Sequence, residues 1–586
     1  MHRHTSFLDF PGHLRSWQKL LPDAVLSAVT LALYLPSLYY GFVWDDAYYV
    51  NLNYRIQGLS LGHQSVVWTQ EYLGHFAPIQ HTLLAILYSM FGLEPFGYHL
   101  AQILLHTACL LLLFRVLEEM ESARVAFVAC LLFAVYPPNI ETVAWISETK
   151  STLAFLFFLI SLWFFLRLRQ TGKWGPGFLC GLFLILSLLS KINTVVAPAI
   201  FLLWDYRQKT LLRKDRLLSL AGFFALCVLF VVVHLNSFYA SGQVIEGSTY
   251  YGGLAVHVMN VPLFVFFYIQ KVLFPLPMSA WHMFVVYPEW NWTLATSWLG
   301  MLALLALLYF RGSRATQFWG AWFLVFLAPV LQLFPFGIWV ADRYLYIPVV
   351  GAFVLLGKGF FWIMDRLPAR SYQAAPQLAL GAILVFFAWH TNQHLPVWRN
   401  NLTLWGATLP TCDTSAYCHT SMGSALLASG QIEPAVRELI RAVELRPAPQ
   451  YLIRLGDVYA MALKDYRQAF IAYSMARTQG GPSINAAFYA KLARLHILTG
   501  DLDAAEQAIQ AGMQDDSHDP SLLVSRTFLE RKKGNLAEAR RFFQSALAIT
   551  GQASRAAGFL SEYWGDPTDV RSLLSDLRPD QSPVPQ

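Results

Sequence analysis

Long apolar runs separated by short polar loops dominate the first two thirds of the chain. A helix of about 20 apolar residues is long enough to cross a bilayer. The pattern predicts eleven such spans, at 22–41, 96–116, 124–137, 151–167, 175–190, 192–205, 217–236, 294–310, 317–335, 345–364 and 377–395. The runs at 124–137 and 192–205 are shorter than a straight crossing needs, and interrupted helices are tolerated where they line a protein cavity.

Two further apolar stretches contain interleaved polar residues and are predicted to lie along the membrane interface. The first, 79–92, includes His81, and the second, 258–274, includes Asn260 and Lys271. This arrangement leaves two large external loops, 42–95 and 237–292.

Lysine and arginine are distributed unequally between the two sides of these spans. Cytoplasmic loops are enriched in both residues. Seventeen lie on the side of the N-terminus, Lys358 falls inside a span, and five lie on the other side, namely Arg55, Lys150, Lys191, Lys271 and Arg343. The sequence therefore predicts a cytoplasmic N-terminus and an extracytoplasmic C-terminal half. No small-x-small cleavage site follows the first apolar run, so we expect no cleaved signal peptide.

The composition agrees with a membrane protein. The chain of 586 residues is 56% hydrophobic and 13% charged, whereas soluble chains contain about 25% charged residues. The 23 Lys and Arg residues before Arg399 exceed the 17 Asp and Glu residues by the whole formal net charge of +6. Because these bases lie in short loops rather than on one soluble face, they argue against nucleic-acid binding.

A fixed period appears after Trp398. Four similar segments end in Ala435, Ala469, Ala505 and Ala539, at intervals of 34, 36 and 34 residues, and seven residues later come Ala442, Ala476, Gly512 and Ala546. A helix-turn-helix unit of this length with small packing positions is typical of tetratricopeptide repeats. We predict a soluble tetratricopeptide α-solenoid over 399–565 and a disordered tail over 566–586. Its concave surface suits a protein partner or acceptor, and a purely structural docking module is the alternative.

The six cysteines give two expectations. Cys109, Cys130, Cys180 and Cys227 fall in predicted spans, where they are expected to pack as small apolar residues. Cys412 and Cys418 lie just beyond the last span. Their spacing fits a disulfide in an oxidising compartment and two unpaired thiols equally well.

Acidic residues in the first two external loops are candidates for chemistry. Asp45 and Asp46 follow the first span directly. Ionisable groups near a bilayer are functional candidates, and a carboxylate base activates a hydroxyl; a solvated loop pair is the alternative. In the second external loop, Glu141 and Glu148 either support this pair or cap a helix.

The external cations are candidate ligands of a lipid phosphate. A guanidinium matches phosphate oxygens bidentately, so Arg343, with Lys191 and Lys271, suits this role. Ordinary snorkelling toward headgroups is the alternative for each, and an ion pair with Asp342 is another for Arg343. The external histidines lack zinc spacing and are interpreted as surface or interface residues; they are His63, His75, His81 and His282.

Several motifs, in this order, resemble those of bacterial relatives of the tetratricopeptide-containing protein O-mannosyltransferases, which belong to the GT-C superfamily. They are Trp44-Asp-Asp46, Gly97-Tyr-His-Leu100 with His106, Glu141-x-Val-Ala-Trp145, Ser190-Lys191, Ala341-Asp-Arg-Tyr-Leu-Tyr-Ile-Pro348 and Trp398-Arg-Asn-Asn. The resemblance covers nearly the whole chain. Two departures are Tyr136-Pro137, where the family has His-Pro, and Thr149-Lys150-Ser151, where Arg-Arg-Asp is frequent.

The resemblance implies an all-α fold, with a GT-C-like membrane domain of about eleven helices over 1–398 before the repeats. It also implies inverting transfer of a sugar from a polyprenyl-phosphate donor to a hydroxyl, on a protein Ser or Thr, at the outer face of a bacterial inner membrane. The repeats would then be periplasmic.

The resemblance further assigns roles to residues. Asp45-Asp46 corresponds to the catalytic acidic motif, Glu141 to the second-loop acid, and Arg343 with Lys191 to the ligands of the lipid phosphate. Asp45 is the expected base, and Asp46 orients it or holds a divalent cation through oxygen ligands. No complete metal shell is visible in the sequence.

Two other classes of function compete with this hypothesis. A non-catalytic membrane anchor would use the repeats to assemble an envelope or pilus complex, and the acidic pair would then be dispensable. A transporter is less well supported, because the spans show no internal repeat and no charged residue other than Lys358 lies deep in a span.

Overall fold

The structure is a computed structural model that describes residues 16–240, 253–333, 338–368, 370–550, 560, 564 and 567–577. Within these ranges all regular elements are helical, as expected for an all-α protein. The chain divides into two compact units, Met1–Ala407 and Thr408–Gln586. The boundary lies after Ala407 rather than after Trp398, because η8 (Leu395–Arg399) contacts η1, α6 and α16 of the membrane unit and Trp405 of α17 (Asn401–Thr408) packs on Trp44.

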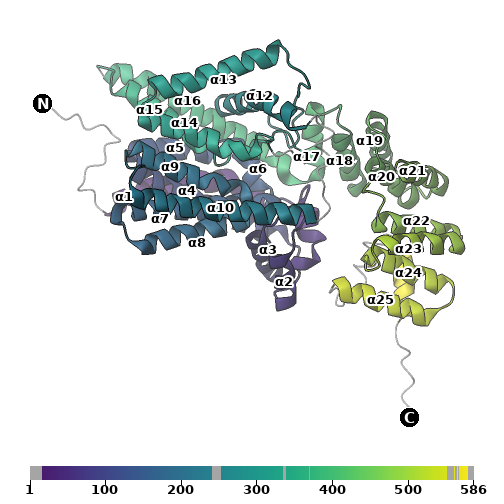
Figure 1. Cartoon of the computed structure of the whole chain (residues 1–586). Helices are drawn as coiled ribbons and strands as arrows, with labels where there is room; N and C mark the ends of the chain where they lie inside the picture. The colour runs from purple at the N-terminus through teal and green to yellow at the C-terminus, as the bar shows by residue number, and fades with distance from the viewer. Residues whose placement is uncertain are drawn as a thin grey trace. The chain divides into compact units, whose positions relative to one another are not determined.

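Seven helices in the described part of the chain are long and apolar enough to cross a membrane. The chain is thus a multi-pass membrane protein, and several of these helices run side by side in Figure 1. They are contained in α1 (Ser16–Tyr34) with the 3-10 turn η1 (Leu35–Tyr39), α4 (Pro95–Met120), the 3-10 turn η4 (Ile146–Glu148) with α7 (Thr149–Thr171), α10 (Lys214–Ala240), α12 (Gly253–Leu273), α13 (Trp292–Arg311) and α16 (Arg370–His394) with η8. All but α12 coincide with predicted spans.

The other predicted spans are shorter helices with interrupted ends. They are α5 (Ala123–Val135), α8 (Trp174–Ser190), α9 (Ala197–Arg207), α14 (Arg314–Leu327) and α15 (Val349–Met364). Helix α5 ends before Pro137 and Pro138, because proline lacks the N–H that continues a helix. A 3-10 turn separates α8 from α9, and another follows α14. The candidate site lies at these interruptions, where irregular backbone is tolerated beside a protein-lined cavity. The number of eleven crossings stays a prediction.

Helix α12 differs from its predicted interfacial role in being long enough to span a membrane. Its two ends nevertheless contact one short segment. His257, near the start, stacks on Trp339 with ring centroids 5.2 Å apart, and Lys271, near the end, pairs with Asp342 at 2.9 Å. These contacts show that α12 lies along the segment that contains Trp339 and Asp342. Its placement at the membrane interface remains a prediction.

Two short helices of the first external loop, α2 (Leu61–Thr69) and α3 (Pro78–Phe91), lie at one end of the bundle (Figure 1). The predicted interfacial stretch 79–92 forms α3. Its polar residues are used in packing, because the Gln80 amide donates a 2.8 Å hydrogen bond to the carbonyl of Ser147 in the second loop. This contact joins the two loops that carry the candidate acids.

A group of ion pairs lies at the far end of α4. Glu121 follows this helix and pairs with Arg207 at 2.7 Å and with Lys358 at 2.8 Å. Lys358, predicted to lie inside a span, thus has a counter-ion in Glu121 at the end of α4. Nearby, Arg169 pairs with Asp205 at 2.7 Å. Arg169 and Arg207, which the charge sorting assigns to the side of the N-terminus, both take part in these ion pairs, whereas the orientation of the chain in the membrane stays a prediction.

The second unit contains four consecutive helix pairs, as the period predicts. They are α18 and α19 (Ala416–Ala428, Ile432–Leu445), α20 and α21 (Pro449–Met461, Tyr466–Gln479), α22 and α23 (Ala486–Thr499, Leu502–Asp515), and α24 and α25 (Pro520–Lys532, Leu536–Thr550). The periodic alanines Ala435, Ala469, Ala505 and Ala539 are completely buried. Gly512 lies so close to the next helix that an added Cβ would sit 2.7 Å from Leu522. Small residues therefore allow these helices to approach closely.

The predicted disordered tail is wrong in its first part. Helix α27 (Pro567–Asp576) buries Val570 and Leu573 in the core of the repeats. Trp564, just before it, stacks on Phe528 of α24 with ring centroids 3.7 Å apart. The apolar residues of this segment were overlooked because they follow the last repeat of the period. Residues 578–586 of the predicted tail lie outside the described residues.

Cys412 and Cys418 form a disulfide, which decides between the two alternatives for this pair. The next residue, His419, holds the same loop through its ring nitrogens. It bonds to the Glu438 carboxylate at 2.6 Å and to the carbonyl of Asp413 at 2.7 Å. The start of the repeat unit is thus closed by a covalent bond and two hydrogen bonds. The other four cysteines are buried thiols, as expected.

Candidate active site

Asp46 ties the first external loop to the second. One carboxylate oxygen accepts hydrogen bonds from the backbone N–H of Ser147 at 2.7 Å and from its hydroxyl at 2.5 Å. The other oxygen accepts the N–H of Val43 at 3.0 Å. The side chain is completely buried, and burial raises its pKa to about 7 against the effect of these donors. Asp46 is therefore engaged in holding the two loops together.

Asp45 has a different environment, although it is the adjacent residue. It is partly exposed, and none of the described residues donates a hydrogen bond to its carboxylate. Burial and Glu148 raise its pKa, whereas the positive charges of Lys150 and Arg343 act in the opposite direction. Two basic residues distant in sequence thus lie within electrostatic range of a carboxylate that remains available to a substrate.

Arg343 is held by Glu141, the second-loop acid. The backbone N–H of Arg343 donates a 2.8 Å hydrogen bond to Glu141, and the guanidinium forms an ion pair with the same carboxylate. Both side chains are buried. The guanidinium also lies over the Trp145 ring, 5.2 Å from its centroid. The structure thus brings Glu141 and Arg343 together, and Asp45 lies within electrostatic range of the same guanidinium.

The alternative interpretation of Arg343, an ion pair with Asp342, is not found among the contacts of the described residues. Asp342 instead accepts bonds from Lys271 at 2.9 Å and from His282 at 3.0 Å. Burial opposes ionisation of Asp342, but these two partners outweigh it and lower its pKa. His282, predicted as a surface or interface residue, is therefore a partner of Asp342, with 7% of its side chain exposed. Neighbours in a 3-10 turn point in different directions, which a sequence pattern does not reveal.

Glu148 is the residue around which the basic side chains gather. Its carboxylate lies 2.9 Å from Lys191 Nζ, 3.8 Å from Lys150 Nζ and 3.5 Å from Arg343 Nε. It is almost completely buried. In the sequence, the only signal for Glu148 was its position in the second loop. Its role as a counter-ion shared by three cations was therefore missed, as was the role of Lys150 as one of those cations. A single carboxylate thus fixes three cations beside Asp45.

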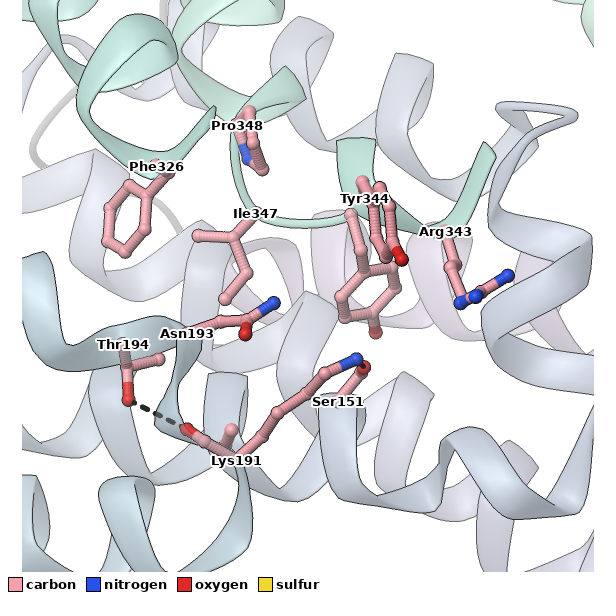
Figure 2. Close-up of a pocket in the computed structure, with 11 residues that line it drawn as sticks. Ser151, Lys191, Asn193, Thr194, Phe326, Arg343, Tyr344, Ile347 and Pro348 are labelled. Atoms are coloured by element: carbon pink, nitrogen blue, oxygen red, sulfur yellow. Dashed lines mark hydrogen bonds between the residues drawn. The ribbon is translucent and has the colours of Figure 1, made fainter. Parts of the chain in front are cut away.

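A pocket opens next to these cations (Figure 2). Figure 2 shows Lys191 extending toward Ser151, and its ammonium is 2.8 Å from the Ser151 hydroxyl. The pocket is cationic on one side and apolar on the other. Its lining consists of Ser151, Ala154, Lys191, Asn193, Thr194, Phe326, Arg343, Tyr344, Tyr346, Ile347 and Pro348. Cationic and apolar side chains thus meet at one surface.

Lys271 does not share this pocket. Besides pairing with Asp342, its ammonium donates a hydrogen bond to the carbonyl of Pro277, and the side chain is buried. The structure therefore separates Lys271 from the other two predicted phosphate ligands. In the chain as described, no group of three His, Cys, Asp or Glu residues is placed to hold a metal ion. His81, predicted at the surface or interface, is buried beside the rings of Tyr49 and Tyr72.

Comparison with known proteins places this site in context. Residues 76–234 match the family described as dolichyl-phosphate-mannose-protein mannosyltransferase. This stretch contains Glu141, Glu148, Lys150 and Lys191, whereas Asp45 and Arg343 lie outside it.

Several curated proteins are similar to larger parts of the chain. Protein O-mannosyl-transferase F38B6.6 of Caenorhabditis elegans is 22% identical over 72% of this chain and 62% of its own. Protein O-mannosyl-transferase TMTC3 of Mus musculus is 22% identical over 78% of this chain and 54% of its own. The chain thus spans a little over half the length of these relatives.

Other similarities are confined to part of the chain. Cellulose synthase 1 operon protein C of Komagataeibacter xylinus is 35% identical over 17% of this chain and 8% of its own length. Among solved structures, YrrB, a tetratricopeptide protein with an unusual peptide-binding site, covers 30% of this chain and 93% of its own, with 17% identity and a TM-score of 0.23.

Fold and sequence together define the class of protein. It is an all-α, multi-pass membrane protein with a buried cluster of acids and bases and a domain of helical repeats. Within that class, the chain is similar to the tetratricopeptide-containing protein O-mannosyltransferases, which confirms the resemblance predicted from its motifs.

Proposed function

We propose that this protein is a membrane glycosyltransferase that moves a sugar from a polyprenyl-phosphate donor to a hydroxyl on a protein Ser or Thr. The reaction takes place at the outer face of a bacterial inner membrane, with the repeats in the periplasm. The similarity to O-mannosyltransferases supports sugar transfer to protein hydroxyls. The charge distribution over the loops supports the orientation.

The observation that carries this proposal is the contrast between Asp45 and the cations beside it. Asp45 offers a partly exposed carboxylate without a hydrogen-bond donor among the described residues. Arg343 and Lys191 line the adjacent pocket. Transfer from a phosphate leaving group needs a base that removes the proton of the attacking hydroxyl and cations that stabilise the departing phosphate. Asp45 and the adjacent cations meet these two needs.

The chemistry follows from these positions. Asp45 accepts the proton of the acceptor hydroxyl as its oxygen attacks the anomeric carbon from the face opposite the lipid phosphate. The bond between the anomeric carbon and the phosphate oxygen breaks, and the lipid phosphate leaves with the electron pair, so the configuration inverts. The lipid phosphate gains negative charge in this step, and fixed cations stabilise such charge in a site shielded from water.

The charges around the pocket are matched to this task. Arg343, Lys150 and Lys191 carry three positive charges, and Glu141 and Glu148 carry two negative ones. The group therefore has a surplus of one positive charge, which offsets the ionised Asp45 carboxylate, so the site as a whole does not repel the single negative charge of a phosphodiester. The apolar wall formed by Phe326, Ile347 and Pro348 suits the first isoprene units of the carrier.

Mass spectrometry of secreted and pilus-type proteins tests the proposal in cells that express single variants. We expect Asp45→Asn and Arg343→Ala to abolish sugar additions, and Asp46→Asn to reduce them through loss of the loop contact. Asp23→Asn is the control, because Asp23 pairs with Arg115, at the end of α4 remote from the site. Unchanged glycan occupancy in all three site variants would refute the assignment. A scaffold would tolerate Asp45→Asn but not deletion of the repeats.

A further inference from the structure

The loop that carries Asp45 rests on the segment that leads into the repeats. The backbone N–H of Trp44 donates a 2.7 Å hydrogen bond to the side-chain oxygen of Asn401, across 357 residues of sequence. The N–H of Gly41 donates a 2.9 Å bond to the carbonyl of Arg399. Two main-chain groups of the first external loop are thus satisfied by residues just before the repeat unit, which begins at Thr408.

Aromatic packing reinforces this contact. Trp44 stacks on Trp145 with centroids 4.5 Å apart and rings 5° from parallel. Trp405 meets Trp44 edge-on at 5.5 Å, and Trp398 packs on Trp145 at 5.9 Å. All four indoles are buried. The segment 395–407 therefore covers the tryptophan next to Asp45 and its partner in the second loop.

Trp44 has a backbone conformation that needs such support. Its φ angle is +52°, in the left-handed region that residues with a side chain rarely adopt. Such conformations persist only where surrounding contacts fix them, and they cluster at functional sites. The peptide unit at Trp44 directly precedes Asp45, so it sets the direction of the aspartate side chain.

We propose that Asn401 is a positioning residue for Asp45. Its side-chain oxygen holds Trp44 in the left-handed conformation, which directs the Asp45 carboxylate toward Lys150 and Arg343. The segment at the entrance to the repeats is thereby part of the scaffold of the reaction site. This inference rests on the proposed function for the role of Asp45, but the geometry is independent of it.

The neighbouring asparagine supplies a matched control. Asn400 is exposed, and its side chain accepts a 2.9 Å hydrogen bond from the N–H of Thr403 at the start of α17. Asn400→Ala therefore removes a helix contact without touching Trp44. Asn401→Asp keeps an oxygen that accepts the Trp44 N–H, and Asn401→Ala removes it. Asn401→Leu, similar in shape to asparagine, replaces Asn401→Ala if that variant does not accumulate in the membrane.

The first measurement is steady-state sugar transfer by the full-length protein in detergent. Misplacing a reacting group by about 1 Å costs about 100-fold in rate, so we expect Asn401→Ala to lower kcat by about 10- to 100-fold. KM for the lipid-linked donor should stay unchanged, because the pocket is not altered. Asn401→Asp should restore most of kcat. A loss of kcat equal to that of Asn400→Ala, or one that Asn401→Asp does not restore, would overturn the proposal.

The second measurement does not depend on activity. In an Asp45→Cys background, the remaining free thiols are buried, so a maleimide reports on position 45. We expect Asn401→Ala to change the labelling rate severalfold and Asn400→Ala to leave it unchanged. Equal rates in both variants would overturn the positioning role. If wild-type protein has no transferase activity but the Asp45→Cys variants show this labelling pattern, the proposed function is contradicted and the positioning role is supported.

Discussion

Glu141 binds Arg343 through both the backbone N–H and the guanidinium of that residue, across 202 residues of sequence. The arginine side chain is therefore fixed before any ligand arrives. Lysine retains the charge but cannot provide the planar fork of donors.

We expect Arg343→Lys to lower transferase activity by about 100-fold or more, the usual cost of removing one donor that stabilises a transition state. Arg124→Lys is the control, because Arg124 also binds a carboxylate, that of Asp365, with two donors, but on an exposed surface. Comparable loss in the two variants would argue against a role at the transition state.

The pH dependence of the reaction should report the ionisation of Asp45. Its pKa lies above the ordinary value of 3.8, chiefly because of burial. A base must be deprotonated, so the rate should fall as the pH is lowered through this raised pKa. Lys150 opposes the upward shift, and Lys150→Gln should therefore move the acid limb of the pH profile to higher pH. A limb that stays in place or moves to lower pH would contradict the assignment of Asp45 as base.

Glu148→Gln should change the binding of the donor at alkaline pH. Burial lowers the pKa of Lys191 to about 8, although the negative charge of Glu148 opposes this shift. Without that carboxylate the pKa falls further, and the ammonium loses its proton at a lower pH. We expect KM for the lipid-linked donor to rise with pH earlier than in wild type. Glu118→Gln, which removes an exposed partner of Arg115, should leave the profile unchanged.

Replacing Gly512 by a larger residue should lower the stability of the repeats. A Cβ at this position would lie 2.7 Å from a side-chain carbon of Leu522 and 2.9 Å from Cβ of Tyr489. Overpacking of this kind costs about 1–3 kcal/mol, so Gly512→Ala should lower the free energy of unfolding of the repeat unit by that amount. Thermal denaturation of the purified chain measures the change. Gln507→Ala, on the exposed face of α23, should shift it by less than about 0.5 kcal/mol.

The disulfide between Cys412 and Cys418 provides a test of orientation. With the repeats outside the cytoplasm, an impermeant reductant added to spheroplasts should break this bond and open the loop that buries Cys412 and Cys418, so that an impermeant maleimide labels both thiols. The four buried cysteines should not react, and a Cys412→Ser/Cys418→Ser variant should remain unlabelled. Labelling that requires permeabilised membranes would place the repeats on the cytoplasmic side.

The sequence pattern predicted best those elements whose formation depends mainly on their own residues, namely the spanning helices and the repeats. A helix that crosses a bilayer satisfies its backbone hydrogen bonds internally, so an apolar run of sufficient length predicts it directly, as for α4 and α7. The interval between Ala435 and Ala469 fixes a repeat for a similar reason, since each unit packs on its neighbour. The helix α27 was missed because it follows the final repeat and belongs to no period.

The candidate acids and bases could be found from the sequence, but their partners could not. Placement near a membrane surface singled out Asp45, Glu141 and Arg343. Which carboxylate binds Arg343 depends on the direction of side chains in a short 3-10 turn, so proximity in sequence could offer Asp342 only as an alternative.

The sequence by itself determined the helical class, the repeats and the set of ionisable residues, because hydrophobic period and charge placement are local properties. Only the tertiary structure decided that Asp46 is occupied by three donors while Asp45 is not. It alone also showed that Glu148 gathers three cations. These features arise where interrupted helices converge, and burial and hydrogen bonding there depend on residues far apart in the chain.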